Sequence, residues 1–129
     1  MSLNILIVDD SKTARAIINK TLSMCGLPLG EVHQAGNGKE ALEVLGAKWI
    51  DLVFADINMP VMNGVEMIER MGENGQLQTV PVIIVSTDGS AARMEQLKSK
   101  GVRAFIHKPF APENVKDIVQ DVLGLKTGA

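Results

Sequence analysis

Cysteine is almost absent from this sequence, and its scarcity limits how the fold can be held together. The 129 residues include one cysteine, Cys25, so no disulfide can form within the chain. A protein without disulfides fits a reducing compartment. Cys25 ends an apolar-periodic stretch and has no histidine near it in the sequence, so we interpret it as a small packing residue.

The sequence also lacks a surplus of positive charge and a long hydrophobic run. The sequence has 13 basic and 15 acidic residues, which gives a net charge of −2. This charge argues against direct nucleic-acid binding. The apolar run Ile5–Val8 is too short for a signal peptide and is followed by two aspartates. No run approaches the roughly 18 to 20 apolar residues of a membrane helix. We therefore expect a cytoplasmic protein that does not insert into a membrane.

What the sequence does contain is an alternation of two patterns. Short apolar runs rich in β-branched residues predict five strands, at Asn4–Val8, Val32–Ala35, Ile50–Ala55, Val80–Val85 and Ala104–His107. Runs without polar alternation are typical of strands covered on both faces, as in a parallel sheet. Each run is followed by a stretch with apolar residues at helical spacing. The pattern predicts an α/β fold, in which five helices wind on both faces of a five-stranded parallel sheet.

Residues 1–126 read as a single domain, with 127–129 as a frayed end. In a flavodoxin-like, doubly wound sheet the strand order is 2-1-3-4-5. The first helix follows Ser11, a plausible N-cap, and its apolar stripe is Ala14, Ile17, Ile18, Leu22 and Cys25. The fourth helix, from about Ser90 to Lys100, has a thinner stripe, and the fifth has Pro112 near its first turn. Gly72–Gln78 is expected to be a polar loop.

Polar side chains follow four of the five predicted strands. They are Asp9 and Asp10 after the first strand, Asp56 after the third, Ser86 and Thr87 after the fourth, and His107–Lys108–Pro109 at the end of the fifth. In open parallel sheets, ligands bind beyond the carboxyl ends of the strands. We therefore expect three carboxylates, a hydroxyl and an ammonium group to converge at one edge of the sheet.

This combination of groups favours phosphoryl chemistry. Three close carboxylates repel one another and need a cation or a proton, and oxygen ligands with room for water suit Mg²⁺. A metal, a lysine and a hydroxyl can hold the oxygens of a phosphoryl group while a carboxylate attacks its phosphorus. Each residue also has an ordinary alternative. Asp56 could cap a turn, Asp9 and Asp10 could cap the first helix, and Lys108 could be a solvated surface lysine.

Four motifs in this order resemble the receiver domain of response regulators, a family that includes stand-alone regulators of the CheY type. They are VDDS after strand one, DINMPVMNG after strand three, PVIIVST on strand four and HKPF after strand five. The resemblance covers essentially the whole chain. It implies that Asp56 accepts a phosphoryl group from a phosphohistidine of a histidine kinase.

The resemblance also implies a role for each residue around Asp56. Asp10 matches the acidic Mg²⁺ ligand, with its neighbour Asp9 acting directly or through water, and the backbone carbonyl of Asn58 matches another ligand. Lys108 matches the lysine that pairs with phosphoryl oxygen, and its bond to Pro109 is expected to be cis. Ser86 matches the switch hydroxyl, in preference to Thr87.

Two further positions carry expectations from the family. Phe105 matches the switch aromatic, which is often a tyrosine, so burial of its ring alone must mark the active state. Asn58 and Asp88 match positions that tune the lifetime of the acyl phosphate, and they suggest a short-lived signal.

The resulting hypothesis is a monomeric switch that turns over no external substrate. Phosphorylation would change the surface of the fourth helix, fifth strand and fifth helix, which then binds a downstream protein in a chemotaxis-type output. A phosphorelay intermediate that passes its phosphate to another histidine is the alternative within the family. A metal-dependent phosphohydrolase is less favoured because Asn58 stands where a second acid would be needed. A nucleotide or flavin module is disfavoured by the absence of a glycine-rich phosphate loop.

Overall fold

The computed structural model describes residues 2–87, 91–108 and 110–124. The strands are β1 (Leu3–Val8), β2 (Leu29–Ala35), β3 (Leu52–Ala55), β4 (Val82–Ser86) and β5 (Ala104–His107). The helices are α1 (Lys12–Met24), α2 (Gly38–Ala47), α3 (Gly64–Glu73), α4 (Gln76–Thr79), α5 (Ala91–Lys100) and α6 (Pro112–Leu123). No helix in these described ranges is both long and apolar enough to cross a membrane.

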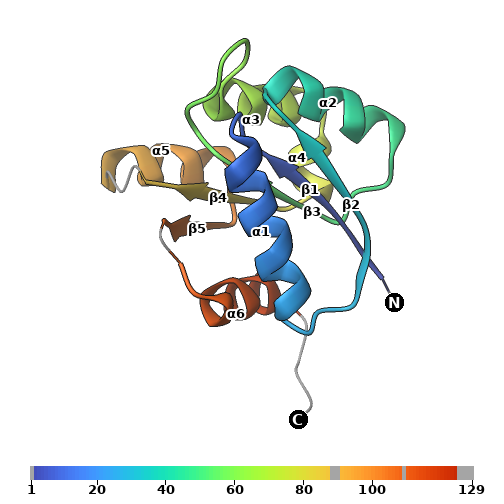
Figure 1. Cartoon of the computed structure of the whole chain (residues 1–129). Coiled ribbons are helices and arrows are strands. Elements are labelled where there is room, and N and C mark those ends of the chain that lie inside the picture. Colours follow the sequence, from blue (N-terminus) through green and yellow to red (C-terminus); the bar gives the residue numbers. More distant parts are fainter. Residues whose placement is uncertain (1, 88–90, 109, 125–129) are drawn as a thin grey trace.

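The strands form one parallel sheet in the order β2-β1-β3-β4-β5, which confirms the predicted fold class and strand order. Helices cover both faces of this sheet (Figure 1). Alternate residues of each strand face opposite sides, so the core has two halves. One half packs Ile7 and Phe54 against α1 and α6, and the other packs Leu6 and Val53 against α2, α3 and α5.

Two predicted helix starts are found in the structure. The side chain of Ser11 accepts a hydrogen bond from the backbone N–H of Ala14 and caps α1. Pro112 is the first residue of α6, where its missing N–H costs no helical hydrogen bond. The fourth predicted helix is α5, which begins at Ala91; Ser90 lies outside the described residues, as do 125–129 and thus the predicted frayed end.

The structure corrects the prediction of five helices, because α4 begins inside the expected loop Gly72–Gln78 and ends one residue beyond it, at Thr79. Gly75 has a φ of 81° and separates α3 from α4, a conformation that glycine adopts without steric cost. The single apolar side chain of the segment, Leu77, is 7% exposed and packs into the core. Burial of Leu77 therefore holds a helical turn whose other residues are polar.

The second strand is also longer than predicted. β2 begins at Leu29 rather than Val32, and its first residue pairs with Leu3 of β1. It is an edge strand with an exposed surface at Gly30 and Glu31. Because the residues at the start of β2 are mostly polar and exposed, the apolar runs of the sequence do not reveal where this strand begins.

Candidate functional site

The carboxyl ends of β1 and β3 bring three aspartates together. Asp9 and Asp10 follow β1, Asp56 follows β3, and one carboxylate oxygen from each lies within 4.8 Å of the others. The N–H of Asp56 donates to the carbonyl of Val8 at 2.9 Å, so adjacent strands fix the spacing. Asp9 is 1% exposed, whereas Asp10 is exposed and Asp56 is intermediate.

Lys108 supplies the positive charge of this cluster from the end of β5. Its Nζ lies 3.0 Å from Oδ2 of Asp9 and 3.7 Å from Oδ2 of Asp56. Its backbone N–H donates to the carbonyl of Ser86 at 3.0 Å, which anchors the loop to the end of β4. One ammonium group therefore neutralises part of the charge of two carboxylates.

Asp56 combines burial with several stabilising contacts. Burial raises the pKa of the Asp56 carboxyl above its ordinary value, and the nearby Asp9 carboxylate adds to the increase. The backbone N–H of Ile57, the charge of Lys108 and the Ser86 hydroxyl act in the opposite direction and lower the pKa. The Ile57 N–H donates to Oδ1 of Asp56 at 2.7 Å. These contacts hold the carboxylate in one orientation, as an attacking nucleophile requires.

The helix after this site begins in close contact with Asp56. Gly64 is the first residue of α3, and its N–H donates to the carbonyl of Ile57 at 2.8 Å. A Cβ at Gly64 would collide with the carbonyl oxygen of Asp56. Glycine is therefore required here for α3 to pack against the backbone of Asp56.

The donor set fits a hard divalent cation. Three carboxylates offer oxygen ligands at mutually short distances, and only one lysine within the described site balances them. Oxygen-only ligands with exposed positions for water suit Mg²⁺. Asn58 is exposed in the loop two residues after Asp56, and the role of its carbonyl as a ligand stays a prediction.

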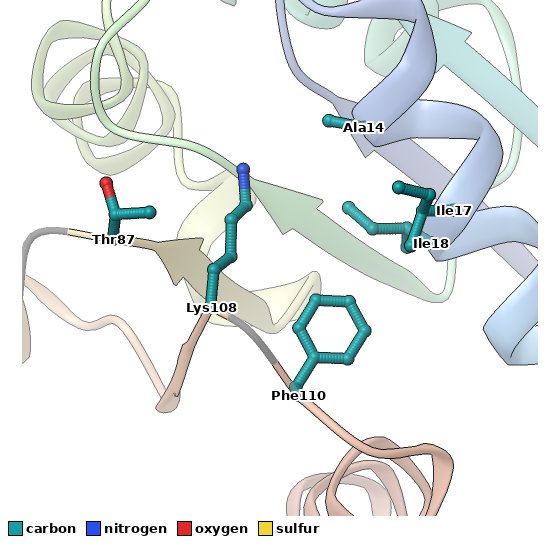
Figure 2. Close-up of a pocket in the computed structure, with 6 residues that line it drawn as sticks. All are labelled: Ala14, Ile17, Ile18, Thr87, Lys108 and Phe110. Atoms are coloured by element: carbon teal, nitrogen blue, oxygen red, sulfur yellow. The ribbon is translucent and has the colours of Figure 1, made fainter.

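Ser86 and Thr87 lie on different sides of the sheet. Ser86 is 4% exposed and shares the face of Ile84 and Phe105, because side chains alternate along a strand. Thr87 is exposed and lines a hollow beside α1 (Figure 2). This arrangement supports Ser86 as the hydroxyl that could communicate with Phe105. The ring of Phe105 is half-buried against the α2–α5 half of the core.

Two sequence expectations lie outside the described residues. Asp88, the expected lifetime-tuning acid, is one, and Pro109, with its expected cis peptide bond, is the other. Both stay predictions.

The hollow beside α1 was not predicted from the sequence. It has a volume of about 300 Å³ and is lined by Ala14, Ile17, Ile18, Thr87, Lys108 and Phe110 (Figure 2). Ile17 had been placed in the apolar stripe of the first helix, but its side chain is 53% exposed. The stripe of α1 is wider than the part that the sheet covers, so Ile17 faces the hollow instead of the core.

Sequence reasoning also missed Arg15. Its Nη1 donates to the backbone carbonyl of Asp9 at 2.5 Å, and its Nε donates to Oε1 of Gln34 at 3.0 Å. A contact to a backbone carbonyl leaves no residue pattern. The first turn of α1 also begins with Lys12, so a cation that opposes the helix dipole there did not single out Arg15.

Comparisons with known proteins agree with this geometry. The family model of the response regulator receiver domain matches residues 5–120. A chemotaxis protein CheY homolog of Campylobacter jejuni is 35% identical over 127 residues, which cover 98% of this chain and 96% of that protein. Chemotaxis protein CheY1 of Helicobacter pylori is 36% identical over 95% of this chain and 98% of that protein.

Solved structures show the same fold. CheY4 of Vibrio cholerae is similar with a TM-score of 0.84 and 32% identity, covering 95% of this chain and 100% of that one. A CheX–CheY–BeF3–Mg²⁺ complex from Borrelia burgdorferi contains a chain with a TM-score of 0.83 and 28% identity, covering 93% of this chain and 88% of that one. With its family match, its strand order and its acidic strand ends, this chain belongs to the response regulator receiver domain family.

Proposed function

We propose that this protein is a two-component response regulator that accepts a phosphoryl group on Asp56 from a phosphohistidine of a partner kinase, with Mg²⁺ as its cofactor. The observation that carries the proposal is the meeting of Asp9, Asp10, Asp56 and Lys108 at one edge of the sheet. The CheY relatives favour a chemotaxis-type output, and the Borrelia complex containing Mg²⁺ supports the choice of cation.

In the proposed transfer, a carboxylate oxygen of Asp56 attacks the phosphorus in line. The new P–O bond forms as the P–N bond breaks, and the bonding electron pair leaves with the imidazole ring. Lys108 neutralises charge on the phosphoryl oxygens, and the Ser86 hydroxyl donates to one of them. Mg²⁺, held by Asp9, Asp10, Asp56 and the carbonyl of Asn58, supplies Lewis-acid stabilisation when bound. No external substrate is turned over, so the protein acts as a switch.

The phosphodonor is expected to approach over the hollow beside α1. Lys108 lines this hollow and its Nζ lies 3.7 Å from Oδ2 of Asp56, so a protein docked over the hollow would lie close to Asp56. Ile17 and Phe110 give the hollow an apolar wall. Burial of that wall would contribute to binding the histidine-bearing domain.

The proposed output is a change in the surface that binds a downstream protein. The phosphoryl group adds about two negative charges and draws Ser86 toward it, which leaves space for the ring of Phe105. The surface that changes is formed by α5, β5 and α6. A depression between β5 and α6, lined by Ala104, Ile118 and Val122 among others, offers part of a site for a downstream protein.

The decisive experiment is incubation with acetyl phosphate and Mg²⁺, followed by intact mass measurement. The wild type should gain one phosphoryl group, and Asp56→Asn should gain none. Asp117→Asn, which changes an exposed aspartate of α6, is the matched control and should be phosphorylated like the wild type. Phosphorylation of Asp56→Asn would overturn the assignment of the nucleophile.

The phosphorylated protein also allows tests of the lifetime of the phosphoryl group and of its transfer to a second protein. Bulky replacements of Asn58 or Asp88 should slow loss of the phosphoryl group, and an unchanged rate would contradict their tuning role. A relay intermediate would pass the phosphoryl group from Asp56 to a histidine of a second protein, whereas a chemotaxis-type regulator would retain it until hydrolysis.

A further inference from the structure

Arg15 links the loop that carries Asp9 and Asp10 to β2, the edge strand of the sheet. It lies in the first turn of α1, and its guanidinium group donates to the carbonyl of Asp9 and to Oε1 of Gln34. Gln34 belongs to β2 and pairs in register with Ile7 of β1. The side chain of Arg15 therefore bridges the end of β1, the start of α1 and the edge strand.

The contact with Arg15 completes the hydrogen bonding of Asp9. The N–H of Asp9 donates to the carbonyl of Ala35 at 3.0 Å. Its carboxylate accepts from the N–H of Ser11 at 2.9 Å and from Nζ of Lys108 at 3.0 Å. The carbonyl of Asp9 is the remaining polar group, and Arg15 donates to it at 2.5 Å.

That carbonyl belongs to the peptide group that links Asp9 to Asp10. Rotation of this peptide would move the exposed Asp10 side chain relative to the buried Asp9, and the three carboxylates would no longer meet. A hydrogen bond from a charged donor is stronger than one between neutral groups. Arg15 therefore restrains the one peptide whose orientation decides whether Asp9 and Asp10 face Asp56 together.

We propose that Arg15 is a positioning residue for the Mg²⁺ site, acting through the Asp9–Asp10 peptide; this inference rests on the proposed function. The electrostatic effect of Arg15 has the opposite sign. A positive charge near a cation site repels the cation, so loss of the charge alone would tighten Mg²⁺ binding. Loss of a positioning contact would weaken it. The sign of the change in affinity therefore separates the two effects.

The test is a calorimetric titration of the unphosphorylated protein with Mg²⁺. Groups that orient metal ligands typically contribute about 10- to 100-fold in affinity, so Arg15→Ala should raise the Kd for Mg²⁺ by about tenfold. Arg15→Lys retains the charge and one donor and should recover part of the loss. Gln34→Met changes no charge but removes the acceptor of Nε, and it should raise the Kd in the same direction by less.

Arg70→Ala is the matched control for charge. Arg70 lies on α3, its side chain is 63% exposed, and its Nη1 lies 3.8 Å from Oε1 of Glu73. The same loss of one positive charge there should leave the Kd unchanged or slightly lower. Far-ultraviolet circular dichroism and thermal unfolding verify that each variant is folded. If Arg15→Ala were unfolded, Gln34→Met would decide the question.

The outcomes separate failure of the positioning role of Arg15 from failure of the proposed function. If the wild type binds Mg²⁺ and both Arg15→Ala and Gln34→Met bind it equally or more tightly, the positioning role is wrong while the proposed function stands. If the wild type binds no Mg²⁺, the proposed function fails and this inference fails with it. A raised Kd in both variants with an unchanged Kd in Arg70→Ala supports the positioning role.

Discussion

The ammonium group of Lys108 is bound more closely to Asp9 than the family role of this lysine would suggest. Its Nζ lies 3.0 Å from Oδ2 of Asp9, whose side chain is 2% exposed. The distance to Oδ2 of Asp56 is 3.7 Å. In the unphosphorylated protein, Lys108 therefore serves chiefly as the counter-ion of a buried carboxylate. It is held close to the position where a phosphoryl group on Asp56 would need it.

Replacement of Lys108 by methionine should affect both stability and reactivity. Removing the partner of a fully buried carboxylate lowers the free energy of unfolding by about 3–5 kcal/mol. Lys108 is 22% exposed, so we expect the free energy of unfolding to fall by about 2 kcal/mol. Loss of a charge that stabilises the transferring group should slow phosphorylation at least about tenfold. Urea unfolding without divalent cations and the rate of reaction with acetyl phosphate measure the two effects.

Lys100→Met is the control for Lys108→Met. Lys100 makes the same type of ion pair at 3.4 Å with Glu69, but both side chains are more exposed. Such surface pairs contribute about 0–1 kcal/mol. Equal destabilisation by the two variants would contradict the assigned role of Lys108.

The raised pKa of Asp56 predicts a stability that depends on pH. Burial is the main cause of the increase, so the folded protein binds a proton at Asp56 more readily than the unfolded chain does. Stability therefore falls as the pH rises from the unfolded pKa through the folded pKa, and the cost of ionising Asp56 in the folded protein is fully present above the folded pKa. Asp56→Asn removes this cost. At pH 7 without divalent cations, it should raise the free energy of unfolding.

The difference between Asp56→Asn and the wild type should shrink as the pH is lowered through the pKa of Asp56. Urea unfolding over a series of pH values in the presence of a chelator measures it. Asp117→Asn, at an exposed position of α6, should not reproduce this trend. A variant Asp56→Asn that is less stable than the wild type at pH 7 would show that the contacts with Lys108 and Ile57 outweigh burial.

The parts of the fold that the sequence predicts are those with strong apolar patterns. The central strands β3 and β4 are buried on both faces, so their apolar runs identify them directly. The start of β2 and the short helix α4 have mostly polar residues. Their positions depend on pairing between Leu29 and Leu3 and on the burial of Leu77. Such tertiary contacts leave little trace in local sequence.

The candidate site was predictable for a different reason. Parallel strands end at one edge of the sheet, so residues after β1, β3 and β5 had to converge once the strand order was correct. The structure brings Asp9, Asp56 and Lys108 together as expected. Arg15 was not predictable in the same way, because it contacts a backbone carbonyl that every residue type provides.

The faces of β4 lead to a prediction about the switch. Ser86 shares the face of Phe105, whereas Thr87 lines the hollow beside α1. Ser86→Ala should therefore still be phosphorylated at Asp56 but should lose the change in the ring environment of Phe105. Nuclear magnetic resonance of the Phe105 ring and of the amides of 91–107, before and after phosphorylation, measures the response. Thr87→Ala removes a neighbouring hydroxyl from the opposite face and should respond like the wild type. Equal responses in both variants would exclude Ser86 as the connecting group.

The loop after Asp56 contains a strained residue. Val61 has a φ of 65°, and the N–H of Met62 donates to the carbonyl of Pro60 at 2.7 Å, which forms a γ-turn centred on Val61. A β-branched residue rarely adopts this conformation. The turn is held in place because the carbonyl of Met62 accepts from the N–H of Gly38 at 2.8 Å. The contact with the start of α2 therefore maintains a conformation that valine disfavours.

Val61→Gly should stabilise the protein. The left-handed conformation destabilises a residue with a Cβ by about 1–2 kcal/mol, and Val61→Gly removes this strain. Glycine is also freer in the unfolded chain, which offsets about 0.5–1 kcal/mol of the gain. The side chain of Val61 is 77% exposed, so little buried area is lost. We expect the free energy of unfolding to rise by about 0.5–1 kcal/mol. Val61→Ala, which keeps a Cβ in the strained conformation, should gain less. If Val61→Gly were no more stable than Val61→Ala in urea unfolding, the turn would not store strain at this residue.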